Sequence, residues 1–140
     1  MEQQISLITL AIKDVSKSKK FYIDGFGWQP IYQTNDTLLY QMNGFTLSTW
    51  LKKELEQDVQ QTISLSNEGI TLAHFVSSSI EVQKLIDHLS SYGGTILRNA
   101  DSPAHGGIRG YIADPDFHIW EIVWNPNFII SENGWFTLNK

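Results

Sequence analysis

Cysteine is absent from this chain of 140 residues, so disulfide bonds, thiolate metal ligands and cysteine nucleophiles are all excluded. Basic residues are scarce: 10 Lys and Arg stand against 15 Asp and Glu, and the net charge is −5. This balance argues against a nucleic-acid partner or an anionic membrane surface. No apolar stretch approaches the roughly 18 residues of a membrane span, and no signal-peptide pattern opens the chain. We therefore expect a cytoplasmic globular protein.

The first half of the chain predicts the order strand, helix, strand, strand, strand. Alternating apolar and β-branched residues indicate the strands, and helical spacing indicates the helix. Asp14 or Ser16 is suited to cap the helix, and Asn43-Gly44 suits a tight type I′ turn between the last two strands. The expected strands span residues 5–12, 28–33, 37–42 and 45–51, and the expected helix spans residues 15–24.

The second half repeats this order, so one half is a distorted copy of the other. Ser78 or Ser79 is suited to cap the helix, and Gly93-Gly94 ends it. A loop over residues 99–107 separates two of the strands. The expected strands span residues 70–77, 95–98, 108–113 and 118–124, and the expected helix spans residues 80–92.

Two modules of this kind make one α+β domain over residues 1–140. Each module is expected to form a curled sheet with its helix on the convex face, and the two sheets then form an incomplete barrel with a concave interior, which is a natural small-molecule site. Residues 52–69 look like a polar surface connection. The tail is too apolar to be free and is expected to pack on its own sheet or on a neighbour. The expected parts are module one over 5–51, module two over 70–125 and the tail over 126–140.

Several short motifs occur in a fixed order along the chain. They are Leu10–Asp14, Ser18–Tyr22, Gly25–Trp28, Gly93-Gly94, Gly110–Asp116 and His118–Glu121. Through them, residues 5–125 resemble the vicinal oxygen chelate superfamily, which holds glyoxalases, extradiol dioxygenases and bleomycin- and fosfomycin-resistance proteins. The resemblance implies a glyoxalase-like fold built from two βαβββ modules.

The resemblance also implies a divalent metal, held by His and Glu on the first and last strands of each module. Carried over, the ligand positions fall on Leu7, Ser48, Thr71 and Glu121. Aligning Trp50 with Trp124 would move one position from Ser48 to Leu47. Only Glu121 is a strong ligand, and catalytic metal sites normally use about three protein ligands. We therefore expect no metal cofactor at the family's usual place, and leave open a divalent metal held by other ligands.

Glu121 lies in the middle of an apolar strand, where an unpaired buried carboxylate is costly. An apolar cup with a few polar groups would fit a small, partly hydrophobic ligand that carries a donor or a cation. Alternatively, Glu121 pairs with Arg98 or Arg109 as a structural ion pair. The candidate ligand-binding residues are Leu7, Ser48, Thr71, Phe75 and Glu121.

Three residues outside this set invite a functional or a structural interpretation. His105 lies in the 99–107 loop, which could be a mobile lid or an inert surface loop, and it is a candidate acid or base. His118 follows a turn and is expected to bond to nearby backbone. Phe117 stands where the family usually has glycine, so we expect an altered turn and an exposed ring that could contact a partner subunit.

Three functions fit these residues. The first is a metal-free small-molecule-binding protein of the resistance or sequestration type. The second is a glyoxalase-like lyase or dioxygenase-related enzyme with Glu121 as base. The third is a structural or regulatory module with a vestigial cavity. A homodimer is expected because exposed sheet edges are commonly covered.

Overall fold

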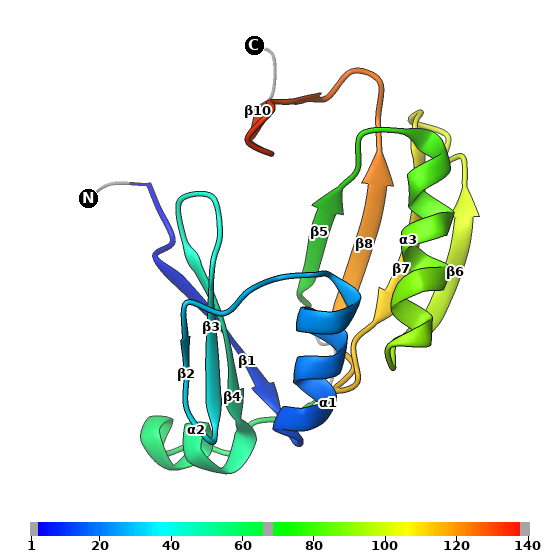
Figure 1. The fold of residues 1–140 in the computed structure, drawn as a ribbon. Coiled ribbons are helices and arrows are strands. Elements are labelled where there is room, and N and C mark those ends of the chain that lie inside the picture. Colours follow the sequence, from blue (N-terminus) through cyan, green and yellow to red (C-terminus); the bar gives the residue numbers. More distant parts are fainter. Residues whose placement is uncertain (1–2, 66–68, 138–140) are drawn as a thin grey trace. The chain divides into compact units, whose positions relative to one another are not determined.

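The computed structural model of the chain describes residues 3–65 and 69–137. The chain forms two compact units, Met1–Ser66 and Asn67–Lys140, so the boundary falls within the expected connection 52–69. Each unit contains its own four-stranded sheet (Figure 1). In the described residues no helix is both long enough and apolar enough to cross a membrane.

The first unit has a sheet in the order β1-β4-β3-β2, with β1 parallel to β4 and the other pairs antiparallel. Its elements are β1 (Leu7–Ile12), α1 (Val15–Lys19), the π-helical turn η1 (Lys20–Gly25), β2 (Tyr32–Gln33), β3 (Thr37–Gln41), β4 (Thr46–Leu51) and α2 (Lys52–Val59). Asp14 caps α1, since its carboxylate accepts hydrogen bonds from the backbone N–H groups of Ser16 and Lys17 at 2.8 and 3.1 Å.

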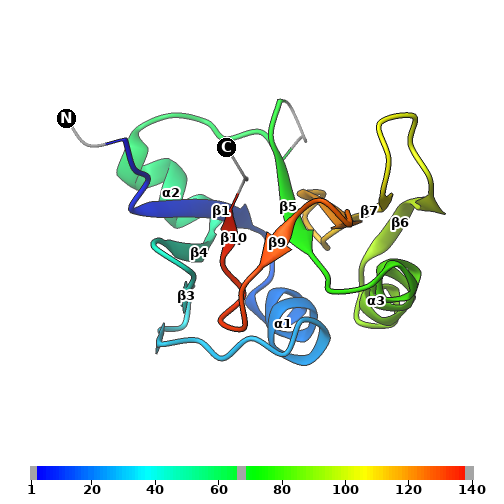
Figure 2. The same ribbon diagram turned by 90° about the horizontal axis from the view of Figure 1, so that it is seen from above.

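The second unit repeats this topology, with its main sheet in the order β5-β8-β7-β6 and β5 parallel to β8. Its elements are β5 (Thr71–Phe75), α3 (Ser79–Ser91), β6 (Thr95–Asp101), β7 (Ile108–Ala113), β8 (Ile119–Trp124), β9 (Ile129–Ile130) and β10 (Phe136–Thr137). Figure 2 shows α3 almost end-on beside its sheet. The matching strand orders confirm the predicted βαβββ repeat and the glyoxalase-like fold class.

The core of the second unit lies between α3 and one face of its sheet. Ile112, Trp120 and Ile122 are buried on that face. Gly110 lies on it as well, where a Cβ atom would meet Cδ1 of Ile86 and would come within 2.9 Å of the Arg98 carbonyl oxygen. A glycine is thus required for the close approach of helix and strand. Alternate residues of β7 and β8 point to the other face.

The first unit follows the same rule. Leu47 and Tyr40 are buried on the helix-covered face, and the ring of Tyr22 lies 5.9 Å from that of Tyr40. Trp50 lies on the other face, because it is three residues from Leu47 on the same strand. Its indole N–H donates to Asp36 at 3.4 Å.

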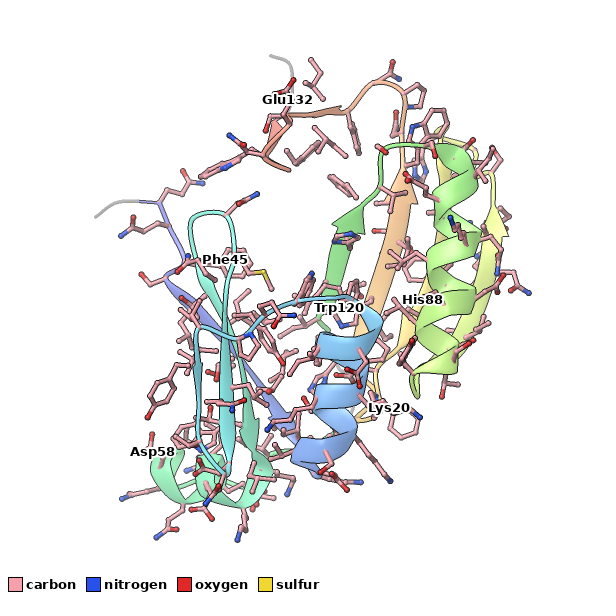
Figure 3. All side chains as sticks on the ribbon, viewed as in Figure 1. Lys20, Phe45, Asp58, His88, Trp120 and Glu132 are labelled. Carbon is pink, nitrogen blue, oxygen red and sulfur yellow. The ribbon has the colours of Figure 1, made fainter. Side chains whose placement is uncertain are left out.

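The connection after β4 contains α2, none of whose residues is buried, with Asp58 exposed on the helix (Figure 3). Two local expectations are wrong. Strand β6 continues to Asp101, so the following loop is shorter than expected. The Asn43-Gly44 turn is not of type I′, because that turn needs positive φ at both residues and only Gly44 has it, at 86°.

Candidate functional site

Glu121 lies on the sheet face of the second unit that points away from α3. In the strand register it stands opposite Ala73 on β5 and Tyr111 on β7. One pleat further, Val123 stands between Phe75 and Arg109. We call this surface the Glu121 face. It consists of Thr71, Ala73, Phe75, Arg109, Tyr111, Ala113, Ile119, Glu121 and Val123.

Glu121 has a neutral partner. The phenol of Tyr111 donates a hydrogen bond to Oε1 of Glu121 at 3.1 Å, and both side chains are half-buried. Burial raises the pKa of the Tyr111 phenol, and the neighbouring Glu121 carboxylate raises it further, while Arg109 acts in the opposite direction. Tyr111 is therefore held in its protonated, donating form.

The two arginines proposed as partners of Glu121 bind another carboxylate. Arg98 donates to Oδ2 of Asp101 from Nη2 at 2.7 Å and from Nε at 3.2 Å, and Nη1 of Arg109 contacts Oδ1 of the same residue. The guanidinium of Arg109 also lies 5.9 Å from the centre of the Tyr111 ring. Among the described residues Glu121 makes no ion pair, so the proposed Glu121–arginine ion pair is wrong.

An aromatic cluster borders the Glu121 face along β5. The ring of Phe75 lies 5.4 Å from that of Phe128 and 4.5 Å, edge to face, from that of Phe136. Phe128 and Phe136 belong to the segment after β8. Of the two expectations for the tail, these contacts favour packing on its own sheet.

The strand register also shows which residue of β4, Ser48 or Leu47, corresponds to Glu121 of β8. Ser48 stands opposite Thr9 on β1, as Glu121 stands opposite Ala73 on β5. Leu47 points into the core and has no such counterpart. Ser48 is 5% exposed, and its hydroxyl lies 3.3 Å from that of Thr37.

The predicted site residues therefore fall into two groups, one in each unit. Leu7 and Ser48 share a face of the first sheet, because their partners on the neighbouring strands, Thr46 and Thr9, alternate with the core positions. Leu7 is 46% exposed there. Thr71, Phe75 and Glu121 share the Glu121 face of the second sheet.

These positions do not fit the metal that the resemblance implies. Leu7, Ser48, Thr71 and Glu121 supply one carboxylate, two hydroxyls and one hydrocarbon side chain, whereas zinc and related metals favour imidazole and carboxylate. Across residues 3–65 and 69–137, no three His, Asp or Glu side chains gather closely enough to hold a metal ion.

His105 is exposed in the loop between β6 and β7. The loop is anchored at both ends: the Ser102 hydroxyl donates to the Gly107 carbonyl oxygen at 3.1 Å. Gly107 has a φ of +78° and leaves no room for a Cβ beside the Trp124 backbone. The role of His105 as an acid or base stays a prediction.

The turn between β7 and β8 differs from expectation in two ways. The His118 ring does not serve the backbone; its Nδ1 lies 2.7 Å from Oδ2 of the buried Asp114. Oδ1 of Asp114 accepts the backbone N–H groups of Asp116 and His118, each at 2.9 Å. Phe117 is exposed but adopts the glycine-like conformation, with φ at +69°, so the turn is not altered.

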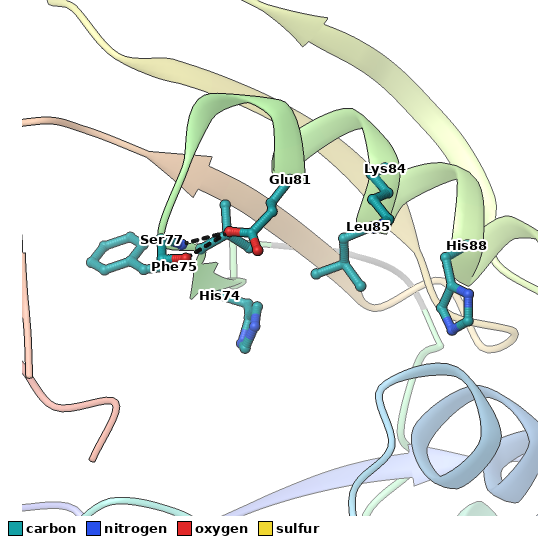
Figure 4. Close-up of a pocket in the computed structure, with 8 residues that line it drawn as sticks. His74, Phe75, Ser77, Glu81, Lys84, Leu85 and His88 are labelled. Carbon is teal, nitrogen blue, oxygen red and sulfur yellow. Dashed lines mark hydrogen bonds between the residues drawn. The ribbon is translucent and has the colours of Figure 1, made fainter. Parts of the chain in front are cut away.

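A separate cavity of about 400 Å³ lies between β5 and α3. In Figure 4 the side chains of His74 and Phe75 leave β5 in different directions, and His88 lies on α3. Burial lowers the pKa of the His74 imidazole. Glu81 lines this cavity too, but its carboxylate caps α3 by accepting from Ser77 and Ser78 at 2.8–3.0 Å. The lining residues are His74, Phe75, Val76, Ser77, Glu81, Lys84, Leu85 and His88.

The βαβββ units and the β8 carboxylate define the class of the protein. The chain belongs to the Glyoxalase/Bleomycin resistance protein/Dioxygenase superfamily, which it matches over residues 4–122. It is 45% identical to a glyoxalase-related enzyme from Fulvimarina pelagi, whose crystal structure matches with a TM-score of 0.95 over 99% of this chain and 100% of that one.

Two more distant relatives extend the comparison. A metallothiol transferase FosB of Lysinibacillus sphaericus (strain C3-41) is 28% identical over 120 residues, which is 85% of this chain and 80% of that protein. A lactoylglutathione lyase from Agrobacterium tumefaciens is 15% identical with a TM-score of 0.68, over 88% of this chain and 94% of that one. The second likeness is one of fold alone.

Sequence reasoning missed Tyr111 and the Arg109–Asp101 pair. The strands predicted over 108–113 and 118–124 flank a short turn, but pairing them symmetrically about residues 114–117 sets Tyr111 opposite Trp120. In the structure β8 begins at Ile119, so Tyr111 stands opposite Glu121 and Arg109 opposite Val123. The bulges of β6, which bring Asp101 opposite Arg109, left no signal in the sequence.

Proposed function

We propose that this protein binds a small organic molecule on the Glu121 face, with Glu121 as the polar anchor and without the metal of its family. The observation that carries the proposal is a half-buried carboxylate whose hydrogen-bond partner is a neutral phenol, 3.1 Å away. A carboxylate in this setting gains from a donor or cation on a ligand. Thr71 and Phe75 supply a hydroxyl and an aromatic wall on the same face. Leu7 and Ser48 are proposed as ligand-binding residues of the first unit, on the matching face of its own sheet.

A thermal-shift screen tests this function, because a ligand that binds only the folded chain raises its melting temperature. We expect hits whose shift is lost in Glu121→Gln and kept in Glu54→Gln, the same change on α2 and the matched control. If Glu121→Gln responds like the wild type, Glu121 is not the anchor. If no compound shifts the melting temperature, the module with a vestigial cavity is the better description.

Metal content is tested separately by mass spectrometry of the purified protein. We expect less than stoichiometric zinc, nickel, manganese and iron, since only one of the four family positions carries a strong ligand. A stoichiometric metal that survives dialysis would overturn the metal-free part of the proposal. It would leave Glu121 as a ligand of that metal.

A glyoxalase-like lyase is the second candidate. It is favoured by the pairing of a carboxylate, suited to act as a base, with a phenol that is held protonated. A lactoylglutathione lyase assay with and without added divalent metal tests it. Turnover that disappears in Glu121→Gln would place the protein among the enzymes of its family.

We also propose a homodimer. β1 and β5 are edge strands of their own sheets, and Ile5 and Ile70 next to them are 63% and 69% exposed. Unpaired edges with apolar flanks favour association. Light scattering coupled to size-exclusion chromatography tests this, and a mass of one chain at micromolar concentration would contradict it.

A further inference from the structure

We infer that the ligand of the Glu121 face carries an organic ammonium group attached to an apolar body. This inference rests on the proposed function and specifies its ligand class. Its basis is the charge distribution of the face and the side chains that border Glu121.

The charges of the face are unevenly compensated. Asp101 is bound by two arginines, through contacts of 2.7 and 3.2 Å from Arg98 and through Nη1 of Arg109. Glu121 has the phenol of Tyr111 instead, which offers a hydrogen bond but no charge. The Arg98–Asp101–Arg109 group keeps one net positive charge, whereas the Glu121 carboxylate is contacted by no guanidinium. Glu121 is therefore the negative charge that is open to a ligand, and it is half-buried, where screening by water is weaker.

The same contacts disfavour an anionic ligand. Both guanidinium groups that such a ligand would seek are engaged by Asp101. Of the two arginines, Arg109 is the one that lies on the Glu121 face, and its side chain is only 12% exposed. An anion would have to displace Asp101 from Arg109 and would then lie one pleat away from Glu121.

The approach to Glu121 is open on the β5 side. Ala73 stands opposite Glu121 on β5 and is exposed, and its methyl group leaves space above the strand. Thr71 and Phe75 flank Ala73 on the same face, two residues away in either direction. A ligand head group that reaches Glu121 over Ala73 therefore passes between a hydroxyl and an aromatic ring.

The aromatic ring makes the ammonium group the best match. Phe75 is held edge to face against Phe136 at 4.5 Å and lies 5.4 Å from Phe128. Aromatic faces attract cations, Phe among them, and the attraction grows as the cation loses water. A carboxylate beside such a cluster adds a charge-assisted hydrogen bond to an ammonium N–H. The apolar body of the ligand would cover the three rings.

Three probes of one shape and different charge test the inference: 2-phenylethylammonium, 2-phenylethanol and phenylacetate. Amide chemical shifts of the labelled protein are followed at pH 7 and low salt. We expect the ammonium probe to shift the signals of residues 71–75 and 119–123 and to bind at least about tenfold more tightly than the alcohol, as close charge pairing allows. Phenylacetate should bind more weakly than both.

Two variants test which side chains cause the preference for the ammonium probe over the alcohol. Glu121→Gln keeps the shape of the side chain and should bring the ammonium-to-alcohol affinity ratio close to one. Phe75→Leu keeps an apolar wall and should weaken the ammonium probe severalfold more than the alcohol. Added salt should weaken the ammonium probe alone, because the site is partly exposed.

The outcomes distinguish a failure of this inference from a failure of the proposed function, which is small-molecule binding on the Glu121 face. If the alcohol or phenylacetate binds at the same residues as tightly as the ammonium probe, the ligand class is wrong and binding on the Glu121 face stands. If the thermal-shift screen yields ligands but none is a cation, the inference fails alone. If no probe and no screened compound binds, both fail.

Discussion

The phenol of Tyr111 and the carboxylate of Glu121 face each other across neighbouring strands at a hydrogen-bond distance of 3.1 Å. The contact orients the carboxylate and accounts for the protonated state of the phenol, since burial first and Glu121 second raise the pKa of Tyr111. It also makes Tyr111 a reporter of the charge on Glu121.

Glu121→Gln should lower the pKa of Tyr111 toward its ordinary value, because a neutral amide no longer opposes ionisation of the phenol. Part of the shift should stay, since burial remains. Alkaline titration of the tyrosine absorbance measures this, and subtraction of the Tyr111→Phe curve isolates the step of Tyr111. An unmoved step in Glu121→Gln would show that the two groups are not coupled.

The same pKa shift has a consequence for stability. A phenol whose pKa is higher in the folded than in the unfolded chain contributes stability that is complete below about pH 10, the unfolded value. That contribution is lost as the pH rises through the folded value. Tyr111→Phe should therefore lose less stability than the wild type between pH 9 and the alkaline limit of folding, measured by urea unfolding.

Gly110→Ala should destabilise the protein by about 1–3 kcal/mol, the usual cost of adding a methyl group to a packed core. The new Cβ would meet Cδ1 of Ile86 and would lie 2.9 Å from the Arg98 carbonyl oxygen. Urea unfolding of the variant measures the cost.

A double-mutant cycle checks the cause. Ile86→Val removes the Cδ1 atom that the new methyl group would meet, at a cost of its own of about 0.5–1.5 kcal/mol. The double variant should lose less stability than the sum of the two single variants. Strict additivity would mean that the contact between α3 and β7 does not decide the cost of Gly110→Ala.

Much of this architecture could be predicted from the sequence, because it depends on local signals. The caps Asp14 and Ser78 and the alternation around Trp120 and Ile122 each specify an element without knowledge of its neighbours. The site was harder, since it depends on which strands pair. Glu121 stood out as a charge in an apolar strand, but the binding of Arg98 and Arg109 to Asp101 depends on two bulges of β6. Helix α2 was missed because only two of its residues, Leu55 and Val59, are apolar, and none of its residues is buried.

His74 should make the protein sensitive to mild acid. Burial lowers the pKa of its imidazole in the folded chain, so the unfolded chain binds the proton more readily. The stability contributed by neutral His74 is complete above about pH 6.5, the unfolded value, and is lost as the pH falls toward the folded value. Glu81, Lys84 and His88 are the other charged or titratable side chains that line the same cavity.

His74→Leu should therefore lose less in melting temperature than the wild type between pH 7.5 and pH 5. The window ends at pH 5 so that the titration of Glu81 does not contribute. Hydrogen bonds from Ser77 lower the pKa of Glu81, so the stability contributed by its ionised carboxylate is lost only at pH values below the ordinary pKa range of a glutamate. His105→Gln, a change at an exposed histidine, is the control and should follow the wild type. Parallel curves for His74→Leu and the wild type would show that another group causes the acid sensitivity.

Phe117→Gly should stabilise the protein by about 1 kcal/mol. A left-handed conformation costs an L-residue with a side chain roughly 1–2 kcal/mol, and glycine avoids this cost but loses part of the gain because its unfolded state has more conformational entropy. Phe117 has a φ of +69° and is 55% exposed, so its ring gives little packing in return. Phe117→Ala separates backbone from ring: it removes the ring, keeps the strain and should not stabilise. Equal effects of the two changes in thermal unfolding would mean that the ring, not the backbone, decides stability at this turn. If only Phe117→Gly stabilises, the wild-type chain holds an exposed aromatic residue in a strained conformation, and such strain persists in proteins at residues that have a function. A lower mass fraction of dimer in both variants would then identify Phe117 as a subunit contact.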